Sequence, residues 1–473
     1  MTEHLDYKTL GFKCGIEIHQ QLSGHKLFCN CPTEIRKGDS DFKVKRYLRA
    51  SAGESGGVDQ AALYEAGKKK YFIYEGHEDI TCLVELDCEP PHPINEEALR
   101  TALQVAKMLN CRIVDEIQVM RKTVIDGSNT SGFQRTMLIG IDGYVEVSGK
   151  KITIDTVCLE EEAGQVIERK KDHDVYNLSR LGIPLIEIAT GPNMHTPEEV
   201  KEVAAKIGMI LRSTDNCKRG IGTIRQDVNL SISGGSRVEI KGFQDLRSIV
   251  KVIEKDIERQ IKFLKSGKRF DPEVRNVEDD FSTSFLRPMP GKDRMYPETD
   301  IPPIKPDLNI AVVKTIEEQV KDLSLKHKLS TDLATAIVKG KIDLDKYASK
   351  YKNLDAKFIA DTLINAPKEI KARFKKDINI FEHIDQLFEK VDSGKIPRSA
   401  VFEILVEIAQ GNKPDYSKYA GVSDAEIEQE TIKLVKDNPA ASPGALMGML
   451  MTKYRGKVDG KKAMEIIKKH KQA

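Results

Sequence analysis

The stretch CGIEIHQQL, residues 14–22, places two chemically active side chains two positions apart. Because side chains alternate between the two faces of a β-strand, Glu17 and His19 lie on the same face. Ile16 and Ile18 form the apolar face behind them. This pattern is typical of a half-buried strand with a solvated polar face, but it also suits a pair of metal ligands on a rigid scaffold. The strand alone leaves both interpretations open.

The same alternation recurs in three later segments with an apolar back, LIEIA, DVNLSIS and RVEIK. Their polar positions include Glu187, Asp227, Asn229, Glu239 and Lys241, and the acidic run CLEEEAG adds Glu160, Glu161 and Glu162. Carboxylates that lie close together raise one another's pKa unless a cation neutralises them. Mg²⁺ suits carboxylate oxygens best, and carboxylates, Mg²⁺ and basic side chains together are typical of phosphoryl-transfer sites. The alternative is a charged sheet face that meets water.

The common nucleotide-binding motifs are absent from the sequence. There is no GxxxxGK[ST] loop, no kinase HRD or DFG, and no GxGxxG after a strand. A nucleotide would therefore bind outside the common phosphate loops. No amidase or Cys-His nucleophile signature is present either.

Eight cysteines are scattered along the chain, a pattern typical of a reducing cytosol rather than of a disulfide framework. Cys29 and Cys31 follow the first strand, and Cys82 and Cys88 lie around a later one. This is not a standard zinc spacing, so a structural zinc and free thiols both remain open. No signal peptide and no apolar run of spanning length is visible, so we expect a cytoplasmic protein without a membrane partner.

The elements that must position these residues change in character along the chain. Period-two strands alternate with amphipathic helices at 92–110, 195–213 and 243–267. Thr196 is the expected N-cap of the second helix, with Glu199 closing a capping box. The alternation predicts an α+β fold with a mainly antiparallel sheet.

Four prolines in 297–307 mark a boundary, after which nearly every segment is an amphipathic helix. We expect a catalytic domain at 1–305, a helical domain at 306–395 and a helical tail domain at 396–473. The two helical parts divide near 393–399. Lys and Arg number 75 against 73 Asp and Glu, so a polyanion site must be a local patch. Residues 451–473, with eight Lys or Arg against two acids, form a tail that is either solvated or in contact with a polyanion.

Several segments, in this order, resemble the GatB/GatE family of tRNA-dependent amidotransferase subunits. They are GIEIHQQL, KLFCNC, RKTVIDGSNTSGFQRT, CLEEEAG, SRLGIPLIEIATGP, GTIRQDVNLSI, RVEIKGFQDL and RMYPETDIPP, with GALMGMLMTKYRGKVDGKKAMEII in the helical tail. The resemblance covers most of the first 305 residues. The sequence is most similar to the archaeal GatE branch, whose members work with an asparaginase-like partner.

The resemblance implies an ATP- and Mg²⁺-dependent ligase of translation. It would phosphorylate the glutamate of misacylated Glu-tRNA-Gln and amidate it with ammonia from the asparaginase-like partner, within a heterotetramer. A tRNA-binding scaffold with weakened catalysis is the alternative. The residues alone also allow an unrelated Mg²⁺-dependent phosphotransferase that acts on a small metabolite.

The resemblance also implies roles by matching position. The catalytic and Mg²⁺-binding residues would be Glu17, His19, Glu161 and Glu187, with Glu160 as an adjacent candidate. The nucleotide and substrate floor would be Asp227, Asn229, Glu239 and Lys241. Residues near an ammonia entry would be Arg121, Lys122, Ser128, Asn129, Gln134 and Arg135. The helical tail would hold the tRNA body through its phosphates.

The chain departs from the family pattern at three places. The acidic motif is usually LEEDA and reads LEEEA here, which puts coordination by Glu162 in doubt. The archaeal branch normally carries a large insertion that resembles part of aspartyl-tRNA synthetase, whereas residues 267–293 are too few to hold it. The zinc cysteines are incomplete beside those of the GatB branch.

Overall fold

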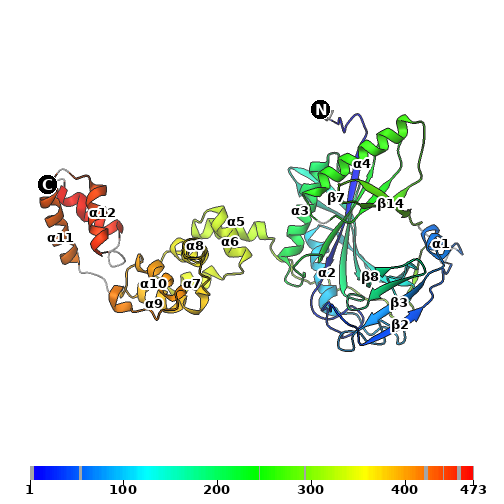
Figure 1. Ribbon diagram of the computed structural model, residues 1–473, viewed down its shortest axis with the longest axis horizontal. Helices are drawn as coiled ribbons and strands as arrows, with labels where there is room; N and C mark the ends of the chain where they lie inside the picture. The colour runs from blue at the N-terminus through cyan, green and yellow to red at the C-terminus, as the bar shows by residue number, and fades with distance from the viewer. Residues whose placement is uncertain are drawn as a thin grey trace. The chain divides into compact units, whose positions relative to one another are not determined.

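The computed structural model describes residues 5–52, 56–243, 245–291, 294–419, 424–439, 441–454 and 460–471. The chain forms two compact units, Met1–Thr315 and Ile316–Ala473, which are described separately (Figure 1). The first is rich in strands and the second is helical, so the predicted α+β class is confirmed.

An eleven-stranded sheet forms the centre of the first unit, in the order β14-β13-β12-β11-β1-β10-β7-β6-β5-β15 with β4 beside β6. The strands are β1 (Lys13–Gln21), β4 (Arg112–Ile113), β5 (Val119–Thr123), β6 (Phe133–Val147), β7 (Lys150–Glu161), β10 (Pro184–Thr190), β11 (Ile224–Ser231), β12 (Val238–Lys241), β13 (Glu273–Val277), β14 (Thr283–Pro288) and β15 (Met295–Pro297). The pairings are antiparallel apart from β12 with β13. The first strand of the chain therefore lies near the middle of the sheet, between β10 and β11.

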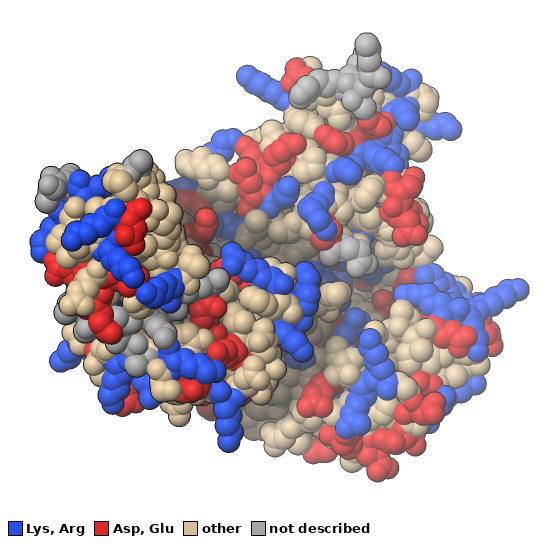
Figure 2. Space-filling model, turned by 60° about the vertical axis from the view of Figure 1, so that its left-hand side comes forward, with Lys and Arg blue, Asp and Glu red and all other residues tan. Residues whose placement is uncertain are grey.

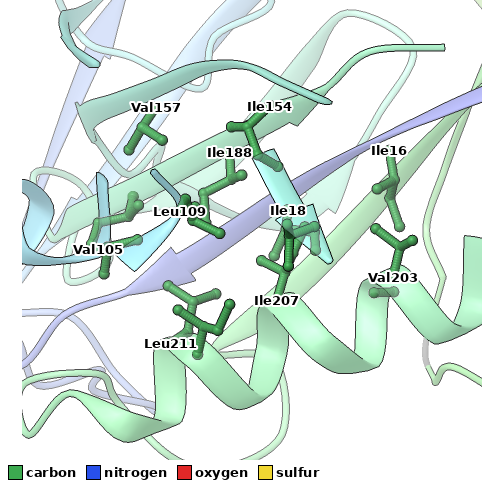
Figure 3. Close-up of a cluster of buried hydrophobic side chains, with 14 of the residues drawn as sticks. Ile16, Ile18, Val105, Leu109, Ile154, Val157, Ile188, Val203, Ile207 and Leu211 are labelled. Carbon is green, nitrogen blue, oxygen red and sulfur yellow. The ribbon is translucent and has the colours of Figure 1, made fainter. Parts of the chain in front are cut away.

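Three helices cover the apolar face of this sheet (Figure 1). They are α2 (Glu96–Met108), α3 (Pro197–Ser213) and α4 (Ser248–Lys265). Ile16, Ile18 and Ile188 of the strands meet Val203 and Ile207 of α3 in the buried core (Figure 3). Burying one such side chain contributes about 2 kcal/mol, so the apolar half of each strand fixes which face the polar half presents.

The start of α3 follows the predicted capping pattern. The Thr196 hydroxyl accepts a hydrogen bond from the backbone N–H of Glu199. The Glu199 carboxylate accepts one from the N–H of His195, one residue earlier than in a regular capping box. Both bonds satisfy donors at a helix end and fix where α3 begins.

A second, four-stranded sheet has the order β2-β3-β9-β8. Its strands are β2 (Phe42–Arg46), β3 (Tyr71–Gly76), β9 (His173–Asn177) and β8 (Gln165–Arg169), and β3 runs parallel to β9. One face buries a small apolar cluster that includes Phe72, Tyr74 and Tyr176. The short helix α1 (Gln60–Gly67) packs Tyr64 edge-on against Phe285 of β14.

The second unit contains two hydrophobic clusters. The first gathers α5 (Ile316–His327), α6 (Thr331–Lys339), α7 (Leu344–Lys350), α8 (Ala356–Phe374), α9 (Ile384–Asp392) and α10 (Ala400–Ala409). The second gathers α11 (Asp424–Asp437), α12 (Pro443–Tyr454) and α13 (Gly460–Lys471). Short 3₁₀ turns occupy Ile380–Glu382 and Tyr416–Tyr419. Ile396 is buried in the first cluster, so the division expected near 393–399 falls inside that cluster.

Parts of two sequence predictions lie outside the described residues. These are 292–293 at the expected insertion junction, and 455–459 and 472–473 of the basic tail. Within the described part of the chain, no helix combines the length and apolarity needed to cross a bilayer. Lys and Arg are interspersed with Asp and Glu over the face drawn in Figure 2, in keeping with the near-balanced charge.

Candidate active site

The order of the strands brings the predicted polar faces together. Because β1 lies between β10 and β11, His19 is paired with Glu187 and Glu17 is paired with Asp227. Asn229 is paired with Glu239 of the next strand, β12. The separate polar stripes of four strands thus form one continuous surface on the face opposite the helices.

His19 and Glu187 form the centre of this surface. The His19 Nε2 atom lies 3.1 Å from a Glu187 carboxylate oxygen. Burial disfavours the charged imidazole, but the hydrogen bond and charge of Glu187 outweigh it and raise the pKa of His19 to about 9. Burial also opposes ionisation of Glu187, yet Lys122 and His19 hold the pKa of that carboxyl below its usual range. The two side chains therefore form an ion pair.

Lys122 joins this pair to a second carboxylate. Its ammonium lies 2.6 Å from Glu160 and 3.9 Å from Glu187. Glu160 also accepts hydrogen bonds from the Thr136 hydroxyl at 2.6 Å and the Gln134 amide at 3.1 Å. A positive charge thus lies between two carboxylates that would otherwise repel each other.

Glu17 is the least compensated carboxylate of the site. It accepts a hydrogen bond from the Asn229 amide at 3.0 Å, and Asn229 is itself held by the Arg237 guanidinium. Burial raises the pKa of Glu17 to about 7, and the charges of Glu187 and Glu239 act in the same direction. A buried carboxyl with such a pKa is one that an added cation would stabilise in its ionised form.

Two overlapping groups of side chains could hold a metal ion. One is Glu17, His19 and Asp227, and the other is His19, Glu160 and Glu187, each with ligand atoms within 4.8 Å of one another. Carboxylate oxygens dominate both groups, which fits Mg²⁺. The raised pKa of Glu17 is a separate observation in favour of a cation at this position.

Lys241 provides positive charge at the other end of the surface. Its ammonium lies 2.5 Å from Asp227 and 2.6 Å from Glu239. Burial disfavours this charge, but the two carboxylates outweigh it and raise the pKa of Lys241. The four residues predicted as the nucleotide and substrate floor are therefore neighbours.

A pocket of about 330 Å³ opens beside Glu17, with Asn229, Arg237 and Asp155 among its lining residues. Gly15 lies in its floor, where a Cβ atom would come within 3.0 Å of the Thr190 carbonyl oxygen. The absence of a side chain at Gly15 thus helps to keep the floor open. The volume is within the range of small-molecule pockets.

The acidic run divides between the two sides of β7. Glu160 joins His19 and Glu187, whereas the Glu161 carboxylate contacts the Arg135 guanidinium at 3.4 Å. Burial raises the pKa of Glu161 although Arg135 opposes this. Of the predicted pair, Glu160 rather than Glu161 lies with the possible metal ligands.

Glu162, the residue that departs from the family pattern, lies in an ion pair. Its buried carboxylate accepts hydrogen bonds from Arg225 at 2.9 Å and from Gln21 at 3.1 Å. Burial disfavours the charge, but Arg225 and Arg180 outweigh it and lower the pKa of Glu162. Its longer side chain is therefore accommodated outside both possible metal-binding groups.

The expected ammonia-entry residues fall into three places. Lys122 and Gln134 contact Glu160 directly. Ser128 and Asn129 lie in the loop between β5 and β6, where Ser128 donates to Asp126 at 2.6 Å and Asn129 donates to Ser128 at 3.3 Å. The two arginines, Arg121 and Arg135, both contact Glu298.

Glu298 was missed by the sequence analysis. Its carboxylate, 1% exposed, lies 2.5 Å from Arg121 Nη2 and 2.8 Å from Arg135 Nε. Arg135 in turn contacts Glu161, so the segment after β15 is tied to the end of β7. The available signal was the acidic PETD sequence itself, which is informative only once β15 is known to pair with β5.

The cysteines are only partly gathered. Cys29, Cys31 and Cys82 lie together with Glu85, and their ligand atoms fall within 4.8 Å of one another. Cys29 Sγ lies 2.8 Å from the Glu85 carboxylate. Cys88, the fourth predicted ligand, is exposed and outside this group. Three thiols and one carboxylate are a possible zinc-binding set, with Glu85 in the place expected for Cys88.

Comparisons with known proteins give a consistent result. Residues 12–311 match the family described as "GatB/GatE catalytic domain". The chain is 36% identical to the GatE component of glutamyl-tRNA(Gln) amidotransferase from Methanocaldococcus jannaschii, over 98% of this chain and 99% of that protein. It is 35% identical to the protein of the same name from Archaeoglobus fulgidus, over 98% of each chain. For that of Pyrobaculum aerophilum the identity is 35%, over 96% of this chain and 98% of the relative.

The alignment with the Methanocaldococcus jannaschii protein also shows a difference in length. It extends over 626 positions, whereas this chain has 473 residues. The relative therefore contains sequence that this chain lacks, although the two chains match from near one end to near the other.

Proposed function

This chain belongs to the GatB/GatE family, and we propose that it is the transamidating component of an archaeal-type glutamyl-tRNA(Gln) amidotransferase. The substrate is glutamate esterified to tRNA-Gln, and the product is Gln-tRNA-Gln. The observation that carries the proposal is the group of His19, Glu187, Glu160 and Lys122 on the polar face of the sheet. A sheet face with a purely structural role has no need of this arrangement.

The reaction requires activation, because a carboxylate is a poor acyl donor to ammonia at neutral pH. In the first step an oxygen of the substrate γ-carboxylate attacks the γ-phosphorus of ATP, and ADP leaves. In the second step ammonia attacks the carbonyl carbon of the acyl phosphate, the carbon–oxygen bond breaks, and inorganic phosphate leaves. The nitrogen then loses a proton to give the amide.

The residues of the site have distinct tasks in this scheme. His19, Glu187 and Glu160, with Glu17 and Asp227 beside them, would hold Mg²⁺. When bound, Mg²⁺ neutralises the charge of the phosphates and of the attacking carboxylate. Lys122 and Lys241 provide further positive charge near the transferred phosphoryl group, and Asn229 and Arg237 line the pocket beside Glu17.

Ammonia comes from a separate protein chain in this proposal. The chain described here carries no amidase or Cys-His nucleophile signature, which fits a partner that hydrolyses an amide. We propose an asparaginase-like partner in a heterotetramer. Lys122 and Gln134, which contact Glu160, are the residues that incoming ammonia would meet.

ATP hydrolysis tests the proposal. With the asparaginase-like partner present, hydrolysis should be stimulated by Glu-tRNA-Gln and not by uncharged tRNA-Gln. Glu187→Gln removes the charge that pairs with His19 and Lys122, and should lower the stimulated rate at least a hundredfold while leaving tRNA affinity near wild type. Glu258→Gln, which changes an exposed glutamate of α4, is the matched control. Unchanged turnover in Glu187→Gln would remove this residue from the site.

A tRNA-binding scaffold with weakened catalysis is the second candidate function. The sequence that this chain lacks relative to the Methanocaldococcus jannaschii protein favours it, because lost segments can carry tRNA contacts. In that case tRNA-Gln would bind, but Glu-tRNA-Gln would not stimulate ATP hydrolysis. The same assay therefore separates the two functions.

A further inference from the structure

A group of aromatic and basic side chains lies on the outer face of the four-stranded sheet. Because β3 and β9 run parallel and Tyr71 is paired with His173, the segments that precede the two strands lie next to each other. Residues 68–70 read KKK and residues 169–171 read RKK. The topology thus brings together two basic runs that are about 100 residues apart in the chain.

The aromatic side chains of this group are stacked. The rings of Tyr71 and His173 lie 4.8 Å apart at an angle of 15°. The Lys45 ammonium lies 3.8 Å from the centre of the Tyr71 ring and 5.3 Å from that of Tyr47. Tyr47 is 67% exposed, so part of its ring surface is free to meet a ligand.

The basic side chains keep donors available. Lys70 and Arg169 share the buried Asp174, while Lys68 and Lys170 pair with Glu65 and Glu168. Lys69 and Lys171 are exposed, and no ion pair of theirs is found within the described ranges. A lysine has three N–H donors, so even the paired ones can contact a phosphate. Seven cations including Lys45 lie against four carboxylates, counting Asp172 and Asp174.

We propose that this patch, called here the Tyr47–Tyr71 platform, binds the RNA body of the substrate. Exposed aromatic rings stack on unpaired bases, and flanking lysines and arginines contact phosphates. An acidic peptide would use the charges but would not require the stacked rings. The identity of the RNA as tRNA-Gln rests on the proposed function.

The platform is linked to the candidate active site through its own sheet. Tyr176 of β9 lies on the opposite face, and its hydroxyl donates to the Asp126 carbonyl oxygen at 2.7 Å. Asp126 holds Ser128 in the loop between β5 and β6. An RNA strand on the platform would thus lie one sheet away from that loop.

Binding of uncharged tRNA-Gln to the full chain tests the platform, measured by fluorescence anisotropy between about 50 and 200 mM salt. Tyr47→Ala should weaken binding roughly tenfold through lost base stacking. The double variant Lys69→Glu/Lys171→Glu should also bind more weakly and reduce the slope of log affinity against log salt by roughly two. Lys201→Glu, an exposed lysine of α3, is the matched control and should bind as wild type does.

Wild-type tRNA affinity in Tyr47→Ala and in the double variant would overturn the platform. Normal tRNA binding together with loss of the asparaginase-like partner would also overturn it and would identify a protein interface. Glu187→Gln separates this inference from the proposed function. If Glu187→Gln keeps full ATP turnover while the platform variants lose affinity, the function fails and the platform stands. The reverse pattern retains the function and rejects the platform.

Discussion

Two guanidinium groups share one buried carboxylate at Glu298. Arg121 and Arg135 come from neighbouring strands, and each would be an uncompensated charge without it. Burial disfavours ionisation, but hydrogen bonds from Arg121 and Arg135 outweigh it and lower the pKa of Glu298. The ionised carboxylate therefore stabilises the folded state.

We expect Glu298→Gln to reduce the free energy of unfolding by about 3 kcal/mol at pH 7, because it leaves buried charges unpaired. A carboxyl whose pKa is lowered on folding contributes stability above its unfolded pKa and loses it as the pH falls through the folded value. The difference between wild type and variant should thus shrink below about pH 4. Urea unfolding at pH 7 and at lower pH measures it. A difference that does not depend on pH would contradict the ionised state of Glu298.

The two neighbouring glutamates of β7 should behave differently. Glu160→Gln removes a carboxylate beside His19 and Glu187, so it should raise the Mg²⁺ concentration for half-maximal ATP hydrolysis at least tenfold. Glu161→Gln weakens the contact with Arg135 and should lower thermal stability, with the Mg²⁺ requirement unchanged. Mg²⁺ titrations of both variants give the comparison. Equal shifts in the two would show that the side of the strand is irrelevant.

The face shared by Glu17 and His19 could be predicted, because the period of a strand fixes it. The polar stripes of Glu187 and Asp227 followed from the same rule. Their convergence could not be predicted, because it depends on β1 pairing with strands more than 160 residues away. Glu298 escaped prediction for the same reason, since its partners lie on strands paired through long-range contacts.

At the level of elements, α3 holds the polar face in place from behind. Val203 and Ile207 of α3 are fully buried against the core that contains Ile16 and Ile18 (Figure 3). The apolar stripe and the Thr196 cap were both predictable, because a 3.6-residue period and an N-cap are local signals. The choice of the sheet face that α3 covers was not local and required the fold.

Ile207→Ala should destabilise the first unit by about 2–5 kcal/mol, because it leaves a cavity beneath the sheet. Thr196→Ala removes one capping bond and should cost about 1 kcal/mol. Chemical unfolding of the two variants measures both values. A smaller loss in Ile207→Ala than in Thr196→Ala would contradict the role given to the α3 core.

At the level of the whole molecule, the chain combines two units with separate cores. The hydrophobic cluster of the first unit contains no residue beyond Ile310, and those of the second unit begin at Ile316, within the ranges that the structure describes. Charged residues make up 31% of the chain and are close to balanced. Neither core depends on the other for burial of its apolar side chains.

We expect the two units to unfold in separate transitions. Calorimetry of the full chain should show more than one heat-absorption peak, and Ile207→Ala should shift only the peak of the first unit. A chain cut at Thr315/Ile316 should keep the far-ultraviolet circular dichroism of both pieces. A single transition that shifts as a whole in Ile207→Ala would contradict this independence.

The central position of β1 also has a consequence during synthesis. The ribosome produces β1 long before its neighbours β10 and β11, since His19 and Glu187 are 168 residues apart and Glu17 and Asn229 are 212 apart. Until then, β1 has two unpaired edges with exposed isoleucines, a state prone to aggregation. Long-range pairing of this kind also slows folding. The nascent catalytic unit must therefore wait for most of its length before its first strand can enter the sheet, and it depends on chaperones during that time.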